Sequence, residues 1–205
     1  MNEKLIEKYR YINVEHWDWW EFVFDDFIED CEAEGISVDY MGVTQGRNAY
    51  PKIVFQLSYS QGDGAAFEGS LFPSYNTLKF LDKHAPNQYP MIRKMIAERG
   101  SVVASWDTTN RGNLGSIVLD VDTFESVLGA DHPLAEVWDA ELDKEVESFE
   151  ELVKEIVEDR CYRLYQNLRD EYEHLVSDEA VWETILANEL DIEESEHEFY
   201  REETR

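Results

Sequence analysis

The acidic residues are the side chains whose spacing most clearly suggests a chemistry. Between Arg10 and Arg47 the chain has no Lys or Arg, and acidic residues recur there at steps of three and four positions. On a helix, such steps place carboxylates on one face. The first predicted row is Asp18, Glu21, Asp25, Glu29 and Glu32, and the row beside it is Asp26, Asp30 and Glu34. A second acidic face is predicted on the C-terminal helices, at Glu150, Glu151, Glu155, Glu158 and Asp159.

These carboxylate rows have a functional and a structural interpretation. Like charges three or four positions apart destabilise a helix by roughly 0.2–0.5 kcal/mol per pair, so the arrangement opposes folding. Successive members lie roughly 5–6 Å apart, close to the spacing of phosphates along a nucleic-acid strand. The rows could therefore occupy the basic groove of a nucleic-acid-binding protein. Alternatively, they form a solvated face or reflect adaptation to high salt.

A glycine-rich run between two predicted strands is the second candidate site. It contains Ser60, Gln61, Gly62, Asp63 and Gly64. Its glycines allow a close backbone approach to a ligand, and successive N–H groups could bind an anion. The structural interpretation is an elaborate hairpin turn, because Asp-Gly is a common turn dipeptide. The run matches neither a P-loop nor the frame of a nucleophile elbow.

The remaining chemical signals predict no metal site, cofactor or catalytic residue. Glu171 with His174, and Glu194 with His197, fit the Glu-x-x-His spacing of di-iron bundles, but so short a motif recurs by chance in an acidic chain. His16, beside several tryptophans, is interpreted as a capping or packing residue. We expect Cys31 and Cys161 to be buried free thiols, because each lies in an apolar helical stripe.

Composition excludes several classes of partner. The 205 residues include 46 acidic and 18 basic ones, giving a formal charge of −28, and most of the excess lies after Ala130. Such a chain is not expected to bind nucleic acid directly or to settle on an anionic membrane. With 43% hydrophobic and 13% aromatic residues it should have a folded core. The absence of a long apolar stretch and of a signal-peptide pattern predicts a cytoplasmic protein with no membrane association.

Hydrophobic periodicity predicts an α+β fold, in which an antiparallel sheet of four or five strands packs against helices. Asn13, Ser148 and Ser177 are predicted helix caps. The expected helices span residues 15–34, 75–83, 86–99, 133–143, 148–175 and 178–188. The expected strands span residues 40–44, 53–59, 65–71, 102–106 and 116–121. The predicted organisation is an α+β core at 1–130, an acidic helical segment at 131–190 packed on the same domain, and an acidic flexible tail at 191–205.

Three runs together resemble a group of phage and prophage proteins that are sometimes labelled antirestriction or antitoxin proteins. These are residues 11–16 with 19–21, residues 60–65 with 67–69, and residues 171–175 with 177–181 and 187–189. Ala66 stands where the group is expected to have a cysteine, residues 107–115 differ from the usual hairpin, and the tail is more acidic. The resemblance implies a role in phage–host conflict, directed against a host defence protein.

Three functional hypotheses follow. The first is a phage-encoded, non-enzymatic inhibitor that binds a host restriction or CRISPR-type complex by nucleic-acid mimicry through both acidic faces. The second is a binding protein or hydrolase for a small molecule such as a nucleotide signal, working at residues 60–64. The third is a structural or antitoxin-like binding partner. A homodimer is left open, because the helix beginning near Phe149 could pack on its own sheet or on a second copy.

Overall fold

The computed structural model describes residues 2–15, 18–42, 49–58, 63–109, 113–129 and 131–190. The chain divides into two compact units, which are described separately here. The smaller comprises residues 1–23 and 166–205, and the larger comprises residues 24–165. The predicted domain organisation, with its boundary at residue 130, stays a prediction.

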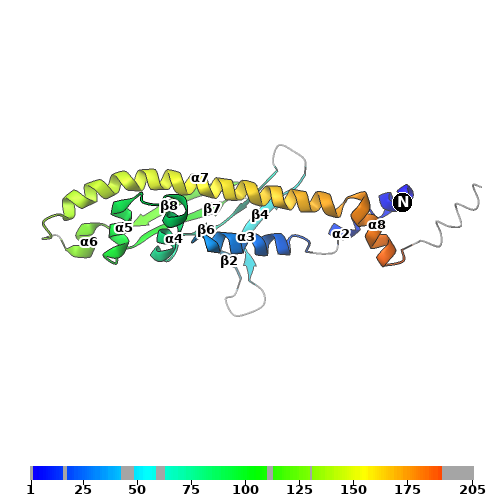
Figure 1. The fold of residues 1–205 in the computed structure, drawn as a ribbon, viewed down its shortest axis with the longest axis horizontal. Helices are drawn as coiled ribbons and strands as arrows, with labels where there is room; N and C mark the ends of the chain where they lie inside the picture. Colours follow the sequence, from blue (N-terminus) through cyan, green and yellow to red (C-terminus); the bar gives the residue numbers. More distant parts are fainter. Residues whose placement is uncertain are drawn as a thin grey trace, which may run out of the picture. The chain divides into compact units, whose positions relative to one another are not determined.

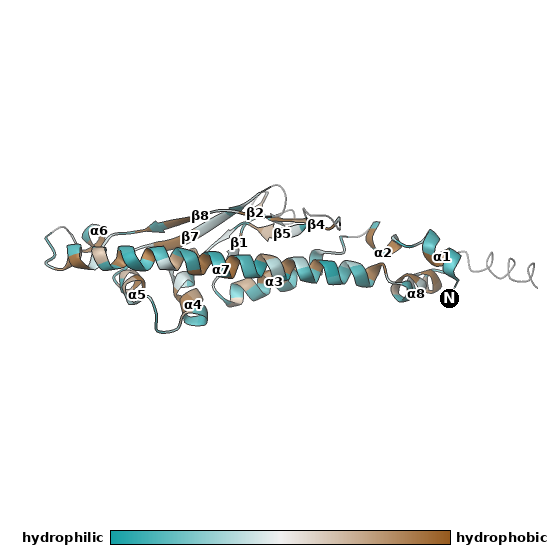
Figure 2. Cartoon of the chain, turned by 90° about the horizontal axis from the view of Figure 1, so that it is seen from above, coloured by the Kyte–Doolittle hydropathy of each residue, from teal (hydrophilic) through white to brown (hydrophobic). Residues whose placement is uncertain are grey.

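The larger unit has an α+β fold, as the periodicity predicts. Its main sheet is antiparallel and has the strand order β1-β6-β7-β8. These strands are β1 (Ser37–Val38), β6 (Gly69–Ser70), β7 (Val102–Thr108) and β8 (Leu114–Val121). Two antiparallel pairs accompany the sheet: β2 (Tyr40–Met41) with β3 (Tyr50–Pro51), and β4 (Ile53–Gln56) with β5 (Gly64–Phe67). Figure 2 shows the strands on one side and helices α4 and α5 on the other.

Alternation of apolar residues explains the central pair of strands. Val102, Ala104 and Trp106 of β7 are buried, and their register partners in β8 are Val121, Leu119 and Ile117. One face of the β7–β8 pair thus packs in the core, whereas Val118 on the other face is 58% exposed. The single strand predicted at 65–71 is wrong, because the chain changes partner at Glu68. β5 pairs with β4, whereas β6 lies between β1 and β7.

The helices of the larger unit enclose an aromatic core. They are most of α3 (Glu21–Ala33), then α4 (Ser74–His84), α5 (Pro90–Ala97), α6 (Phe124–Leu128) and α7 (Ala135–Leu175) up to residue 165. Phe67 is fully buried and meets the ring of Phe27 at 5.0 Å and that of Trp106 at 5.6 Å between centroids. Both contacts are edge-to-face, which is a favourable geometry for aromatic pairs. They link α3 to β5, and β5 to β7 of the main sheet.

Two predicted helix starts are wrong for identifiable reasons. The first helix begins at Glu21 instead of near residue 15, since Ile12–Glu15 forms a separate short helix, α2. Asn13 lies within α2 and therefore does not cap α3. The helix predicted from residue 86 begins at Pro90, because Asn87 and Tyr89 have positive φ values of 66° and 58°. The Glu145 carboxylate accepts hydrogen bonds from the backbone N–H groups of Met91 and Ile92 at the start of α5.

The two helices predicted at 133–143 and 148–175 form the continuous helix α7 (Figure 1). Ser148 does not cap a helix there, since its hydroxyl donates to the carbonyl of Glu145 at 3.1 Å. The buried residues Leu142, Phe149, Val153 and Val157 continue the helical spacing through the expected break. Burial of this stripe makes the helix continuous despite its local capping pattern.

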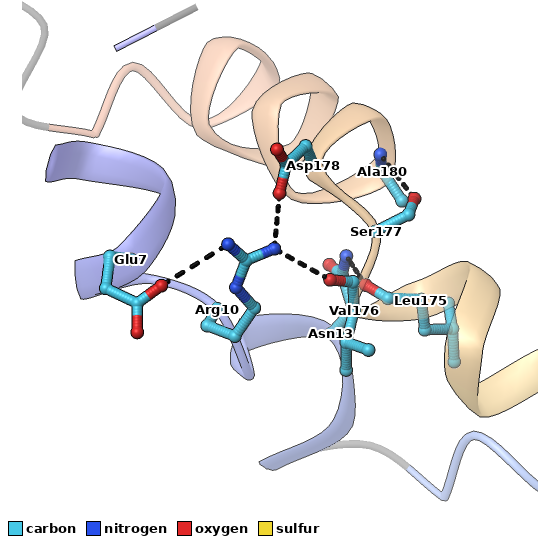
Figure 3. A network of polar contacts seen from close by, with 8 residues as sticks. All are labelled: Glu7, Arg10, Asn13, Leu175, Val176, Ser177, Asp178 and Ala180. Atoms are coloured by element: carbon cyan, nitrogen blue, oxygen red, sulfur yellow. Dashed lines mark hydrogen bonds and ion pairs between the residues drawn. The ribbon is translucent and has the colours of Figure 1, made fainter. Parts of the chain in front are cut away.

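The smaller unit packs the N-terminal helices against α8 (Asp178–Ala187). Leu5 and Ile6 of α1 (Glu3–Lys8) are buried with Val181 and Ile185. Arg10 donates hydrogen bonds to Asp178 and to the carbonyl of Val176, and its guanidinium pairs with Glu7 (Figure 3). The Asn13 amide donates to the carbonyl of Leu175 at 2.9 Å. The Ser177 hydroxyl accepts from the N–H of Ala180, so the predicted cap is confirmed. The predicted tail lies outside the described residues.

None of the helices in the described part of the chain has the length and apolar character needed to cross a membrane.

Candidate protein-binding surfaces

Helix α3 presents an acidic face in the larger unit. Its inner side buries Phe24, Phe27 and Cys31, and its outer side carries five exposed carboxylates: Asp25, Asp26, Glu29, Asp30 and Glu32. None of the five forms an ion pair with a residue that the structure describes. At about 1.5 Å per residue they extend over about 10 Å of helix. We call these five residues the α3 face.

The two remaining members of the predicted first row lie in the smaller unit. Asp18 precedes α3 and Glu21 is its first residue, and both are exposed. Glu21 lies in the first turn, where a negative charge interacts favourably with the helix dipole. The α3 face is therefore defined without these two residues.

Strands β2 and β3 carry exposed side chains, and one of them, that of Tyr40, lies near the α3 face. Tyr40 and Met41 of β2 are 49% and 58% exposed, and Tyr50 of β3 is 63% exposed. Burial raises the pKa of the Tyr40 phenol, and the negative charges of Glu32 and Asp25 raise it further. This effect of Glu32 and Asp25 places Tyr40 beside the α3 face. The surface thus combines carboxylates with side chains of the kinds enriched at protein interfaces.

Glu34, predicted to extend the second acidic row, is buried instead. Its carboxylate pairs with the Arg160 guanidinium of α7, and lies 3.2 Å from Nε2 of His84 and 3.9 Å from Nζ of Lys83. Gly35 ends α3 with a φ of +86°, and a Cβ there would lie 2.4 Å from the carbonyl oxygen of Asn76. The close approach of α4 brings Lys83 and His84 to Glu34, and α7 supplies the Arg160 guanidinium, so the buried carboxylate has an ion-pair partner. Burial lowers the pKa of His84, although Glu34 opposes the change.

The end of α3 is held by α4 as well. No basic residue lies in the last turn of α3, and Glu32 places a negative charge at the negative end of the helix dipole. The Lys79 ammonium of α4 supplies the positive charge that this end of the helix lacks, because it donates to the Glu32 backbone carbonyl at 2.6 Å.

The acidic residues predicted on α7 have different surroundings. Glu150, Glu151, Glu155 and Glu158 are exposed, whereas Asp159 is half-buried and pairs with Arg163 at 2.8 Å. Lys154 lies four residues from both Glu150 and Glu158, so it occupies the same side of the helix. This part of α7 therefore carries charges of both signs, although Glu151, Glu155 and Glu158 still follow one another at steps of four and three.

The glycine-rich run is described only at its end, since Ser60, Gln61 and Gly62 lie outside the described residues. The Asp63 carboxylate accepts hydrogen bonds from the backbone N–H of Ser58 at 2.9 Å and from its hydroxyl at 2.6 Å. Asp63 and Gly64 line a hollow of about 490 Å³. Its other lining residues are Ala65, Asn113, Leu114, Glu158, Cys161, Tyr162 and Tyr165.

This hollow has the chemistry of a cation site more than that of a phosphate site. Two carboxylates, Asp63 and Glu158, and two tyrosines line it, and no Lys or Arg is among its described lining. A phosphate group would meet the negative charge of Glu158 there. Sequence reasoning missed the walls from β8 and α7, because no local pattern links Leu114 or Tyr162 to the glycine-rich run.

The two cysteines are buried free thiols, as predicted. Burial raises the pKa of Cys31 to about 12 and that of Cys161 to about 11. Both thiols are therefore protonated near neutral pH, which makes them poor nucleophiles and metal ligands.

The two Glu-x-x-His motifs can be placed only in part. Glu171 and His174 lie on α7, whereas Glu194 and His197, like His16, fall outside the described residues. Within the described ranges, no group of three or more His, Cys, Asp or Glu side chains is arranged to hold a metal ion.

Comparison with known proteins identifies a family. A family described as "Domain of unknown function (DUF8835)" matches residues 19–178, which is more than three quarters of the chain. No curated protein and no solved structure matches the chain. The match includes the α3 face, the whole sheet and α7, so the surfaces described above belong to the family domain. The chain is a member of the DUF8835 family.

Proposed function

We propose that this protein is a non-enzymatic inhibitor that binds the basic nucleic-acid-binding surface of another protein through the α3 face. The observation that carries the proposal is the set of five exposed carboxylates without an ion-pair partner among the described residues. A salt-bridged acidic surface would have satisfied its charges within its own fold. The α3 face instead leaves its charges available to a partner.

The electrostatics favour such an interaction. Asp25, Glu29 and Glu32 form one row, and Asp26 and Asp30 form a second row beside it. Each row repeats negative charge at roughly 5–6 Å, which approximates the charge repeat of a nucleic-acid strand. A net charge of −28 would attract a basic partner from a distance and accelerate association.

An exposed aromatic residue would complete an interface. Charge complementarity contributes mainly to association rate and specificity, whereas desolvated aromatic side chains contribute much of the affinity. Tyr40 supplies such a contact near Asp25 and Glu32. A partner with a basic groove flanked by apolar residues would fit both parts.

The class of partner comes from the resemblance to phage and prophage proteins. It points to a host anti-phage defence protein that handles nucleic acid, such as a restriction or CRISPR-type complex, acting in the host cytoplasm. Occupying its nucleic-acid groove would block cleavage without any chemical step. The protein itself would not bind nucleic acid, because both carry dense negative charge.

The alternative function, binding or hydrolysis of a nucleotide signal at residues 60–64, has weaker support. Asp63 and Gly64 do line a hollow, but the carboxylates of Asp63 and Glu158 disfavour the phosphates of such a ligand.

Competition with nucleic acid tests the proposal. Purified restriction endonucleases and CRISPR effector complexes are mixed with labelled duplex DNA, and displacement of the DNA by the protein is followed by fluorescence anisotropy. We expect displacement from at least one complex, weakening as salt rises from 0.05 to 0.3 M because of screening. The triple variant Asp25→Lys, Glu29→Lys, Glu32→Lys should displace DNA about tenfold or more less well.

The matched control changes the same charge elsewhere. The triple variant Glu136→Lys, Glu141→Lys, Glu147→Lys alters three exposed residues near the beginning of α7. It should reduce displacement by less than about threefold, because distant surface charges are screened. Equal losses in the two triple variants would rule out the α3 face, and absence of displacement across the whole panel would rule out the proposed function.

A further inference from the structure

Strand β8 forms one edge of the main sheet, and no other described strand lies along that edge. The strand order ends at β8 and places β7 on its other side. Natural edge strands are usually short, or are protected by Lys, Pro or inward-pointing charges. β8 spans eight residues and contains neither Lys nor Pro, and its one charged residue, Asp120, is exposed. The edge is therefore suited to pairing with an additional strand.

The register identifies the backbone groups that this edge presents. The N–H of Asp122 donates to the carbonyl of Ser101 at 2.9 Å, one position beyond the last register pair of β7 and β8. Hydrogen-bonded and non-hydrogen-bonded positions alternate along an antiparallel pair. Val118 and Asp120 therefore direct their N–H and C=O groups toward β7. The residues whose backbone groups point to the free edge are Ile117, Leu119 and Val121.

The side chains of these three edge residues are incompletely covered. They lie on the core side of the sheet, as their register partners in β7 do. Those partners are at most 4% exposed, whereas Ile117, Leu119 and Val121 are only half-buried. Removing apolar surface from water is favourable. An added strand with apolar residues at alternate positions would therefore complete the burial of this edge.

β8 itself has the pattern that such a strand requires. Two copies of β8 can pair antiparallel about a two-fold axis at Leu119, which places Leu119 opposite its own counterpart and Ile117 opposite Val121 of the second copy. Every edge position then meets an edge position, and the pairing is the same from both copies. The irregularity in the β7–β8 register, between Trp106 and Thr108, lies outside this segment.

The one charge on β8 selects this register. Like charges directly opposite each other destabilise an antiparallel pair. With the axis at Leu119, Asp120 stands opposite Val118 of the second copy. An axis at Asp120 would instead set the two aspartates against each other. An axis at Val118 would pair Val121 with Gly115, where the pairing with β7 is irregular.

We infer that the chain forms a two-fold dimer in which the β8 strands of two copies pair antiparallel about Leu119. The pairing joins two four-stranded sheets into one continuous sheet. Three edge positions in each copy give about six main-chain hydrogen bonds. At about one hydrogen bond per 100–200 Å², these correspond to roughly 600–1,200 Å² of interface, the size of a weak, reversible complex. This interface is separate from the α3 face and goes beyond the proposed function.

Salt distinguishes this association from binding at the α3 face. Each copy carries a net charge of −28, so two copies repel each other, and added salt screens the repulsion. The dimer should therefore tighten by about threefold or more as NaCl rises from about 0.05 to about 0.3 M. Displacement of DNA through the α3 face should weaken over the same range. Failure of one of the two proposals is thus recognised independently of the other.

Sedimentation equilibrium of the full chain measures the dimer, and quenched amide hydrogen exchange read by NMR locates it. In about 0.15 M NaCl we expect a dissociation constant of about 10–100 μM. The amides of Ile117, Leu119 and Val121 should exchange about threefold or more slowly at about 0.5 mM chain than at about 5 μM. The amides of Val118 and Asp120, which face β7, are the internal control and should change less.

Two matched variants test the register. Val118→Asp sets an aspartate opposite Asp120 of the second copy, twice in the symmetric pair, and should weaken the dimer about tenfold. Ser105→Asp adds the same charge at the exposed register partner of Val118, one strand further from the edge, and should weaken it less than about threefold.

Four outcomes would each overturn the inference. The first is a chain that stays monomeric up to about 0.5 mM, far above the expected dissociation constant. The second is a dimer in which the three edge amides are not protected, and the third is an equal effect of the two variants. The fourth is protection of the edge amides that does not depend on concentration, because another segment of the same chain would then cover β8.

Discussion

Helices α3 and α7 both carry acidic residues at helical spacing, but the two sets have different surroundings. The five carboxylates of the α3 face have no ion-pair partner in the described part of the chain. On α7, Lys154 lies between Glu150 and Glu158, and Arg163 pairs with Asp159. The α3 face is therefore anionic, whereas this side of α7 carries charges of both signs. The cations of α7 stand four positions from the carboxylates on the same helix, so the local sequence sets this difference.

A similar contrast exists between α3 and the residue that follows it. Glu34 follows the last turn of the helix and is 7% exposed, whereas Glu29, one and a half turns earlier, is exposed. The first carboxylate is surrounded by Arg160, His84 and Lys83, and the second faces solvent. Glu34 therefore contributes to the structure, and Glu29 is available for binding.

The largest expected effect comes from removing the partner of the buried carboxylate. Arg160→Met should lower the free energy of unfolding by about 3–5 kcal/mol, because it leaves Glu34 buried beside weaker partners. Urea unfolding followed by circular dichroism measures this. Glu29→Gln is the matched control on the exposed side of α3 and should change stability by less than about 0.5 kcal/mol. Similar values for the two variants would show that Glu34 is not held as described.

The buried thiols of α3 and α7 should be strongly protected from alkylation. Cys31 lies on α3 and Cys161 on α7, and burial raises their pKa values to about 12 and about 11. At pH 8 iodoacetamide should modify each at least about a hundredfold more slowly in the native protein than in urea, because the thiolate is the reactive form. Mass spectrometry of quenched samples gives the rates for each cysteine. Fast native labelling of Cys31 alone would mean that α3 separates readily from the core.

The buried cluster should make stability depend on pH in a defined direction. Burial lowers the pKa of His84 below its ordinary value of 6.5, although the charge of Glu34 raises it and the charges of Arg160 and Lys83 lower it. Below pH 6.5 the unfolded chain therefore binds a proton that the folded chain resists. The contribution of His84 to stability is complete above pH 6.5 and is lost as the pH falls through the folded value.

Urea unfolding at pH 7.5, 6.5 and 5.5 measures this dependence, with His84→Gln as the comparison. The difference in stability between wild type and variant should become smaller toward pH 5.5. A constant difference would show that His84 titrates equally in the folded and unfolded states.

The smallest expected effect distinguishes the two acidic helices directly. The double variant Asp25→Asn, Glu29→Gln removes a like-charge pair and should raise the free energy of unfolding by about 0.2–0.5 kcal/mol. Glu150→Gln, Glu158→Gln removes carboxylates spaced four residues from Lys154 and should not stabilise the protein. Thermal unfolding at low salt resolves the difference. The comparison fails if both double variants stabilise the protein equally.

Much of the local structure could be predicted from short-range patterns. Alternation of Val102, Ala104 and Trp106 identified β7, and the apolar stripes around Cys31 and Cys161 identified the buried sides of α3 and α7. The cap at Ser177 was also correct. These features depend on residues within one or two turns or along one strand. Where two local patterns indicated different structures, the prediction was wrong. At Ser148 the capping pattern predicted a helix start, but the continuous buried stripe places the residue inside α7.

The candidate surfaces could be predicted only in part. The sequence by itself determined the strong negative charge, the α+β class, the buried thiols and the outward placement of Asp25 and Glu29, because these follow from composition and periodicity. Only the tertiary structure decided that Glu34 is buried against Arg160 and that Leu114 of β8 lines a hollow with Glu158 and Asp63. Those contacts join residues distant in sequence, and local periodicity carries no information about which such residues meet.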